Sequence, residues 1–254
     1  MCGRFALTAS PEEVRALLQY LDLPNFPPRY NIAPTQPIAI VRQGPGGRRF
    51  ALVRWGLVPG WVKDPASFSL LINARSETAG EKPAFRAAMR HRRCLVPASG
   101  FYEWKKMEGG RKQPFWIRPR DGGLVAFAGL WEEWSDPDSG DIETGAILTT
   151  SAAGRIAEIH DRMPVVIGKE DFADWLDVLN VGHREAAELL KPAPEDLFEA
   201  IPVSTRVNSA RDDDPGLQEE VQPVSSGGEK DGGGDRKRSG RTKAAKTDGQ
   251  LDLF

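Results

Sequence analysis

Residues 93–104 read Arg-Cys-Leu-Val-Pro-Ala-Ser-Gly-Phe-Tyr-Glu-Trp and hold two short runs of branched and aromatic residues. The runs are residues 94–97 and 101–105, and glycine follows serine in the gap between them. Branched and aromatic residues are enriched in strands, whereas glycine and proline interrupt them. This stretch therefore predicts two consecutive β-strands with a break between them.

The same pattern recurs along the chain in both directions from this stretch. Further strands are predicted at 38–42, 50–55, 69–73, 115–118, 124–131 and 144–150, with hairpin loops at 42–47 and 105–112. Short helices are predicted at 83–90, 154–159, 169–176 and 184–190. The pattern indicates an α+β fold with a curled, mostly antiparallel sheet, a barrel-like core and several short helices.

One helix near the N-terminus has a clear start signal. Ser10 is the expected N-cap, Pro11 occupies the first helical position, and Glu13 completes a capping box. Apolar residues then recur at helical spacing, and prolines end the helix between 24 and 28. These apolar residues are Val14, Leu17, Leu18 and Leu21.

The composition is that of an ordinary globular chain. The formal net charge is −2 over 254 residues, so any affinity for DNA must come from local clusters of charge. Two cysteines are too few for a disulfide framework, which favours a reducing cytoplasm and, for a DNA-acting protein, association with the nucleoid. The cysteines and histidines show no metal-ligand spacing, so neither a metal nor another cofactor is expected. No signal peptide and no membrane-spanning run is predicted.

The composition changes after Ser204. Residues 2–204 are predicted to form the folded domain, and 205–249 are predicted to be a disordered linker with a basic block at 236–246. The last five residues turn apolar again and resemble the bacterial sliding-clamp-binding motif. These five residues are Gln250, Leu251, Asp252, Leu253 and Phe254. A sliding clamp is therefore an expected partner, which would hold the domain near replication forks.

Cys2 has distinctive chemistry once Met1 is removed. The residue then carries a free α-amine, with an ordinary pKa of about 8, beside its thiol. A neutral amine attacks aldehydes to give a Schiff base, and the thiol can close onto the imine carbon to form a thiazolidine. By position alone, the favoured interpretation is that Cys2 is merely a small residue that follows Met1.

An ordered series of motifs decides between these interpretations of Cys2. The series comprises 1–5 (MCGRF), 30–36 (YNIAPTQ), 54–61 (RWGLVPGW), 73–78 (NARSET), 93–104, 128–131 (AGLW), 149–152 (TTSA) and 159–164 (IHDRMP). In this order the motifs resemble the SOS-response-associated peptidase (SRAP) family, also called abasic-site processing proteins, over residues 2–204.

The resemblance implies an enzyme that senses abasic sites in single-stranded DNA. Members of the family form a stable thiazolidine cross-link to the lesion through the mature N-terminal cysteine, which here is Cys2. The cross-link protects the lesion from strand cleavage, and the family name refers to an SOS response and to autopeptidase removal of Met1. A lyase activity is a further expectation, and action on a single lesion favours a monomer.

The resemblance also assigns catalytic roles. Glu103 is expected to transfer protons to and from the α-amine and the imine, and His160 to protonate the sugar oxygen as the ring opens. Asn73 is expected to bond either the opened sugar or the N-terminal backbone. From the residues alone, Glu103 would be a solvated strand residue, His160 a cap or packed residue, and Asn73 a turn former.

DNA contacts are expected from arginines, one serine and exposed aromatics. Contacts to the phosphate backbone give affinity without sequence preference, and aromatic rings stack on bases. The expected residues are Arg4, Trp55, Trp61, Arg75, Ser76, Arg86, Arg90 and Arg162. For both tryptophans, a place in the core is the alternative.

Two other functions remain open at this stage. One is a thiol peptidase that acts in trans, with Cys2 as nucleophile and His160 as base. The other is a non-covalent reader of modified bases in duplex DNA, whose binding would survive the loss of Cys2.

Overall fold

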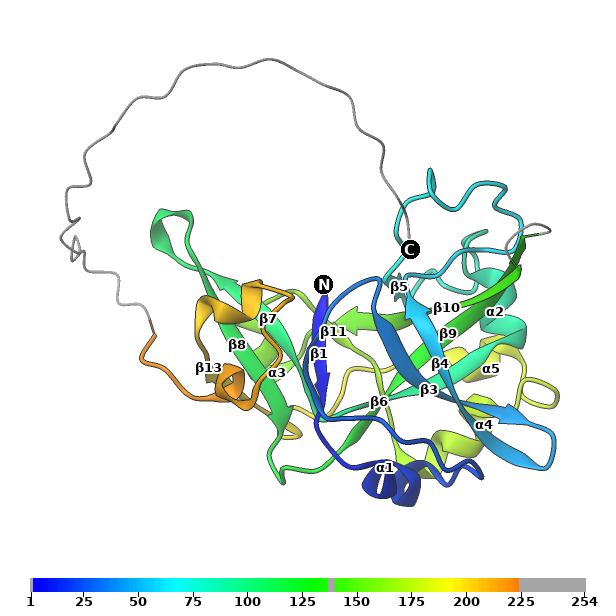
Figure 1. The fold of residues 1–254 in the computed structure, drawn as a ribbon, viewed down its shortest axis with the longest axis horizontal. Coiled ribbons are helices and arrows are strands. Elements are labelled where there is room, and N and C mark those ends of the chain that lie inside the picture. Colours follow the sequence, from blue (N-terminus) through cyan, green and yellow to red (C-terminus); the bar gives the residue numbers. More distant parts are fainter. Residues whose placement is uncertain (1, 137–139, 224–254) are drawn as a thin grey trace, which may run out of the picture. The chain divides into compact units, whose positions relative to one another are not determined.

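The computed structural model describes residues 2–136 and 140–223, which form two sheets around a shared core (Figure 1). The first sheet is antiparallel, with strand order β13-β8-β7-β1-β2. Its strands are β1 (Arg4–Leu7), β2 (Arg29–Ile32), β7 (Gly100–Lys106), β8 (Lys112–Pro119) and β13 (Phe198–Pro202). In this sheet β1, the strand that follows Cys2, lies between β2 and β7.

The second sheet closes into a barrel. Its ring consists of β3 (Pro37–Gly44), β4 (Gly47–Trp55), β6 (Arg93–Ala98), β9 (Val125–Asp136) and β10 (Gly140–Ser151). The ring closes because β10 pairs with β9 as well as with β4, and the β10–β4 pairing is parallel. Three short strands extend it: β5 (Asn73–Arg75), β11 (Arg162–Pro164) and β12 (Val166–Ile167). The expected barrel-like core with mostly antiparallel pairing is thus confirmed.

Both predicted hairpin loops are present. In the β3–β4 hairpin Gly44 pairs with Gly47, which leaves a two-residue turn in which Gly46 adopts a φ of 78°. Glycine tolerates this left-handed conformation without the steric cost that a side chain would add. The β7–β8 hairpin turns through the 3-10 helix η1 (Glu108–Gly110). Local sequence chemistry therefore determines both turns.

The helices are short. They are α1 (Pro11–Leu18), α2 (Arg86–His91), α3 (Gly154–Ala157), α4 (Phe172–Leu176), α5 (His183–Ala187) and the 3-10 helix η2 (Lys169–Asp171). At α1 the capping box of Ser10 and Glu13 is confirmed. The helix ends earlier than expected, since Gln19 is left-handed and Leu21, predicted on the apolar face, is half exposed.

The strands that the sequence did not predict are short or lie at sheet edges. They are β1, β2, β11, β12 and β13. The strand expected at 69–73 is shifted, because only β5 pairs with β10 in that region. Such strands owe their conformation to distant partners, so local propensity alone does not reveal them.

Aromatic side chains join the two sheets. Phe5 of β1 packs edge-to-face on Trp55 of β4 and on Phe127 of β9, with ring centroids 5.2 Å and 6.2 Å apart. Phe101 of β7, which belongs to the same sheet as Phe5, also packs edge-to-face on Phe127, with ring centroids 6.0 Å apart. Edge-to-face pairs contribute about 0.5–1.5 kcal/mol each beyond the area they bury. These contacts hold β1 and β7 against the barrel.

The folded part extends beyond the predicted boundary at 204. Two further 3-10 helices, η3 (Thr205–Asn208) and η4 (Pro215–Gln218), follow, and Val207 and Leu217 are fully buried. The expectation of a linker that starts at 205 is therefore wrong for residues 205–223. The polar composition of this segment conceals a few well-placed apolar anchors. The remainder of the predicted linker, and the clamp-like peptide at 250–254, lie outside the described residues.

Candidate functional site

Cys2 lies just before β1 and is fully buried. Its carbonyl oxygen accepts a hydrogen bond of 2.8 Å from Nδ2 of Asn73, and its Sγ lies 3.6 Å from the carbonyl oxygen of Arg4. The Asn73 bond is the second of the two alternatives expected for this side chain. It ties the N-terminal residue to β5 of the barrel sheet.

Glu103 reaches Cys2 through the register of β1 and β7. Arg4 pairs with Tyr102 and Phe5 with Phe101, so Glu103 stands opposite residue 3, next to Cys2. Alternation along β7 places Glu103 on the same face as Phe101, which belongs to the main core, and away from Tyr102.

Glu103 is 2% exposed. The interpretation of Glu103 as a solvated strand residue is therefore wrong, because both faces of β7 are covered. A carboxylate is costly to bury, which makes such a position uncommon for a purely structural residue.

The environment keeps the Cys2 thiol protonated. Burial raises the pKa of the thiol far above its ordinary value, and the negative charge of Glu103 raises it further. A thiol with a raised pKa is a poor first nucleophile near neutral pH. The same charge interaction makes Glu103 the nearby group that can accept the thiol proton in a later step.

Asn73 holds an unused acceptor. Its Oδ1 atom is buried and has no hydrogen-bond partner among the described residues. Buried polar atoms in native proteins are nearly always hydrogen-bonded, so an exception indicates an absent partner. An amine or a sugar hydroxyl group would complete the bonding of this amide.

His160 precedes β11 and has two partners at the same ring nitrogen. Nδ1 lies 3.0 Å from the backbone nitrogen of Arg162 and 2.8 Å from Oδ1 of Asp161. These contacts exclude each other for a given proton position, since neutral Nδ1 accepts from the Arg162 N–H and protonated Nδ1 donates to Asp161. Nδ1 of His160 thus has both a hydrogen-bond donor and an acceptor within reach.

Asn73 and His160 both lie at the same end of β10. Asn73 of β5 pairs with Ile147, and β11, which begins two residues after His160, pairs with 149–151. The structure thus joins Cys2 to Asn73 by a hydrogen bond, places Glu103 close enough to affect the Cys2 thiol electrostatically, and places His160 on the loop before β11.

The residues predicted to contact DNA fall into two groups. Arg75, Arg86, Arg90 and Trp61 are exposed, and Ser76 is partly exposed. Trp61 is 61% exposed and packs edge-to-face on Phe68 at 5.8 Å. These residues are free to meet a ligand.

Three other predicted DNA contacts are corrected by the structure. Trp55 is fully buried, and its Nε1 donates to the carbonyl oxygen of Ile72, so its ring cannot stack on a base. Arg162 is 8% exposed and bonded to Glu77, and the guanidinium of Arg4 is bonded to three protein oxygens. Arg4 and Arg162 therefore have internal partners instead of free surface positions.

Sequence reasoning missed Glu77 and Asn31. Glu77 was noted only within a motif, yet it binds both terminal nitrogens of Arg162. Asn31 is a fully buried amide that bonds Arg4 and the C-terminal segment. Asn31 could have been found from the Tyr-Asn-Ile run, in which an amide lies between two strand-forming residues. Such an amide needs hydrogen-bond partners when it is buried.

Across the described residues, no helix is long and apolar enough to cross a membrane.

The chain is similar to several proteins of one kind. It is 38% identical to the abasic site processing protein YoqW of Bacillus subtilis, in an alignment that covers 86% of this chain and 99% of that protein. It is 35% identical to the abasic site processing protein YedK of Escherichia coli (88% and 100%) and 32% identical to the abasic site processing protein HMCES of Gallus gallus (89% and 82%).

Solved structures and a family model agree with these sequence matches. A crystal structure from Bacteroides thetaiotaomicron superposes with a TM-score of 0.78 at 26% identity, and covers 87% of this chain and 100% of that one. A phage-related protein of Bordetella bronchiseptica gives 0.66 at 32% identity, with 80% and 94% covered. The model for the SOS response associated peptidase (SRAP) family matches residues 1–210. The chain therefore belongs to the SRAP family, whose relatives named here are abasic site processing proteins.

Proposed function

We propose that the mature protein senses abasic sites in single-stranded DNA and binds them covalently as a thiazolidine through Cys2. The observation that carries this proposal is the place of Cys2: its carbonyl group is held by Asn73, and the register of β1 and β7 brings buried Glu103 opposite the residue next to Cys2. An aldehyde is the partner that a 1,2-aminothiol traps most readily, and the open form of an abasic sugar presents one.

The α-amine acts first in this scheme. The raised thiol pKa leaves the sulfur protonated near neutral pH, whereas a useful fraction of an ordinary α-amine is neutral there. The amine nitrogen attacks the aldehyde carbon to give a carbinolamine, which loses water to form an imine. His160 donates the proton that opens the sugar ring, and the contacts of its Nδ1 with Arg162 and Asp161 orient the imidazole.

The thiol then closes the ring. Sulfur forms a bond to the imine carbon while its proton passes through Glu103 to the nitrogen, which becomes a secondary amine. The sum is one aldehyde and one aminothiol converted to one thiazolidine and one water. Glu103 is suited to this transfer because its charge acts on the thiol and because both residues are buried, so water is largely excluded from the site.

Asn73 positions the nucleophile. Its Nδ2 fixes the Cys2 carbonyl, which orients the residue about its Cα atom, and its Oδ1 is available for the amine or for a sugar hydroxyl group. Such preorganisation lowers the activation free energy because the reacting atoms are already held close to the geometry that the reaction requires.

The single-stranded DNA is held by contacts that do not depend on its base sequence. Arg75, Ser76, Arg86 and Arg90 lie on the surface between β5 and the end of α2 and would bind phosphates. Trp61 offers an exposed ring on which an unstacked base can lie. Affinity from phosphate contacts falls with added salt.

Removal of Met1 precedes the reaction, since an N-terminal peptide bond would leave no free amine. The family description as a peptidase supports hydrolysis of the Met1–Cys2 bond by the protein itself. Mass spectrometry of purified Cys2→Ala and Glu103→Gln variants tests this, because self-processing predicts retained Met1 in at least one of them.

A denaturing gel tests the cross-link. Native protein mixed with a single-stranded oligonucleotide that holds one abasic site should give a heat-stable shifted band. Cys2→Ala and an N-terminally extended form should give none. Cys94→Ala is the matched control, because Cys94 is equally buried but far along the chain, on β6, and should leave the band unchanged.

The same gel separates the alternatives. No band with native protein, with the abasic site intact and Met1 absent, would refute the covalent mechanism. Cleavage of peptides without DNA would then favour a thiol peptidase. Binding of modified duplex DNA that survives Cys2→Ala would favour a non-covalent reader.

We also propose that the peptide of Gln250, Leu251, Leu253 and Phe254 binds the bacterial sliding clamp. These residues lie outside the described part of the chain, and the proposal rests on their order in the sequence. Calorimetry with purified clamp tests it: replacement of Leu253 and Phe254 by alanine should abolish binding, and unchanged affinity would refute the idea.

A further inference from the structure

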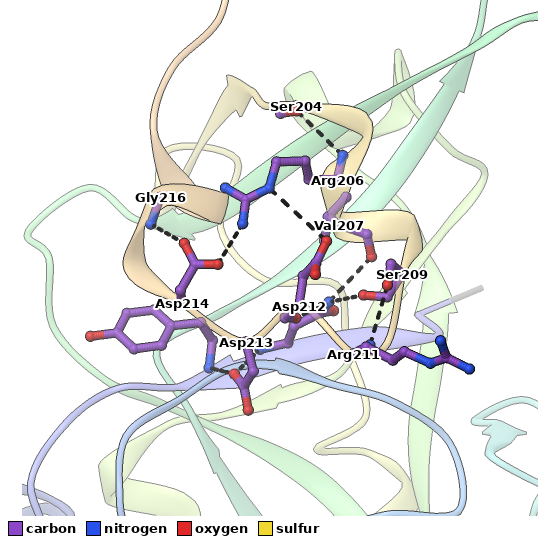
Figure 2. A network of polar contacts seen from close by, with 11 residues as sticks. Ser204, Arg206, Val207, Ser209, Arg211, Asp212, Asp213, Asp214 and Gly216 are labelled. Carbon is purple, nitrogen blue, oxygen red and sulfur yellow. Dashed lines mark hydrogen bonds and ion pairs between the residues drawn. The ribbon is translucent and has the colours of Figure 1, made fainter.

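Residues 204–221, called the strap below, lie against the strand that follows Cys2 and contact β7, the strand that holds Glu103. Polar contacts crowd this segment (Figure 2). Its two buried residues, Val207 and Leu217, anchor it, and Val221 donates its N–H to the carbonyl oxygen of Pro202. Most of the strap lies beyond residue 210, where the family match ends.

Arg4 is the first point of attachment. Its Nη1 donates to the carbonyl oxygen of Val207 at 2.7 Å and to Oδ1 of Asn31 at 2.8 Å, and its Nη2 donates to the carbonyl oxygen of Asn208 at 3.0 Å. Arg4 is also the residue of β1 nearest Cys2 that is paired with β7. The strap therefore holds the last paired residue before the nucleophile.

Asn31 of β2 joins this point to the rest of the strap. While Oδ1 accepts from Arg4, Nδ2 donates to the carbonyl oxygens of Ser209 and Asp212 at 2.9 Å and 2.8 Å. The amide is fully buried. A buried amide with all its bonds made fixes geometry, because rotation in either direction would leave polar atoms unpaired.

Asp213 adds a second tie to β2. Its carboxylate accepts from the backbone nitrogens of Tyr30 and Asn31 and pairs with the guanidinium of Arg29. These backbone groups lie on the edge of β2 that no further strand covers, since β2 ends the strand order of its sheet. The strap thus caps a sheet edge next to the strand that carries the nucleophile.

The strap also reaches the strand of Glu103. Val207 packs with Tyr102 and Trp116 on the face of β7–β8 opposite Glu103, and Trp104 Nε1 donates to Oδ1 of Asn208 at 2.8 Å. Because the strap covers this face, Glu103 is held on the buried side of β7 between Tyr102 and Trp104, both of which the strap contacts.

We infer that the strap is a positioning device for the reaction, which holds Cys2 and Glu103 at their working separation through Arg4, Asn31 and Asp213. Chain ends fray unless they are tied down, and in the mature protein Cys2 is the chain end. A displacement of 1 Å at reacting atoms can cost about a hundredfold in rate. This inference rests on the proposed cross-linking function for its kinetic consequence.

The test compares two aspartates of the strap. Asp213 binds β2, whereas the contacts of Asp214 are to Arg206 and to the nitrogen of Gly216, both within the strap. In full-length mature protein, Asp213→Ala should slow single-turnover cross-linking at saturating DNA by about tenfold or more, and Asp214→Ala by less than about twofold. Affinity for an oligonucleotide with a tetrahydrofuran site, which has no aldehyde, should stay within about twofold for both variants.

Hydrogen exchange supplies a readout that does not depend on the chemistry. The amides of β1 should exchange faster in Asp213→Ala but not in Asp214→Ala, because only the first change loosens the edge of β2. Asn208→Ala is a second, milder variant in case Asp213→Ala fails to fold. Asn208 is exposed, and the substitution removes only the hydrogen bond that its side chain accepts from Trp104.

The outcomes separate this inference from the proposed function. Equal exchange in β1 for both aspartate variants would overturn the strap, whatever the native protein does to DNA. If both variants slowed cross-linking equally, the slowing would reflect a general loss of stability, and this outcome would also overturn the positioning role of the strap. Native protein that shows no cross-link, together with faster β1 exchange in Asp213→Ala, would refute the proposed function but leave the strap as the tie that holds the N-terminus.

Discussion

Replacement of Arg162 by methionine should destabilise the fold strongly, although arginine is usually a surface residue. The Arg162 side chain is 10% exposed, and its guanidinium donates to both carboxylate oxygens of Glu77, at 2.6 Å and 2.9 Å, and to the carbonyl oxygen of Thr149. Thr149 pairs with both β5 and β11. The guanidinium therefore fastens the end of β10 near Asn73 and His160.

The magnitude follows from these partners. A hydrogen bond from a charged donor to a buried carbonyl group is worth about 1.5–3 kcal/mol. The Glu77 side chain is 48% exposed, so the ion pair adds about 0.5–1 kcal/mol after solvent screening. Methionine retains the apolar packing of the arginine stem. Arg162→Met should thus cost about 2–4 kcal/mol of the free energy of unfolding, and Glu77→Gln only about 0.5–1 kcal/mol.

The ion-pair part of this cost should depend on pH. Hydrogen bonding to Arg162 lowers the pKa of Glu77 in the folded protein below its ordinary value. A lowered folded pKa contributes stability above the unfolded pKa of about 4.3, and that stability is lost as the pH falls through the folded pKa. The gap between wild type and Glu77→Gln should be constant from about pH 5 to pH 8 and should vanish at acid pH.

Urea denaturation followed by circular dichroism at pH 7 and pH 3 measures both quantities. The gap for Arg162→Met should shrink at pH 3 but persist, because the bond to Thr149 does not titrate. A loss under about 0.5 kcal/mol at pH 7, the size typical of surface substitutions, would refute the assignment of Arg162 as an internal tie. An unchanged gap for Glu77→Gln at pH 3 would refute the electrostatic part.

Three further predictions concern the core, a helix start and the DNA surface. Gly129→Ala should lower the free energy of unfolding by about 1–3 kcal/mol, because a Cβ atom there would lie 2.8 Å from Cys94 Sγ and from Val96 Cγ2 in the barrel; a chemical denaturation curve equal to wild type would contradict this packing. Ser10→Ala should cost about 1 kcal/mol through loss of the α1 capping box, and a melting temperature unchanged by the substitution would argue against a stabilising cap. Trp61→Ala should weaken binding to a single-stranded oligonucleotide with a tetrahydrofuran site by about 1–3 kcal/mol in fluorescence anisotropy, while Leu179→Ala, at an apolar residue that is even more exposed and lies on the loop before α5, should not; equal affinities for the two variants would remove Trp61 from the interface.

Local features of the chain were predictable because their causes are local. The β3–β4 turn needs glycine at a left-handed position, and the start of α1 needs a cap, so the residues themselves signal both. Runs of branched and aromatic residues, interrupted by glycine and proline, indicated the barrel strands for the same reason. The chemistry of Cys2 was equally local, since an amine and a thiol on one residue react together wherever that residue lies.

Partnerships across the chain could not be predicted. Glu103 and Trp55 follow ordinary strand patterns, yet one is a buried acid and the other a core ring, because distant elements cover them. Residues 205–223 are polar in composition, and their order depends on Arg4 and Asn31, which precede them by more than 170 residues.

The sequence by itself determined the fold class, the turns and the family, since each follows from patterns within the chain, and it predicted Cys2 as the nucleophile from covalent chemistry and from the resemblance to that family. Only the tertiary structure decided which charged and aromatic side chains face the solvent, where the folded chain ends, and how Cys2 comes to lie beside Glu103. These depend on strand register and on long-range hydrogen bonds, whose free energy is realised only when segments far apart in the chain meet.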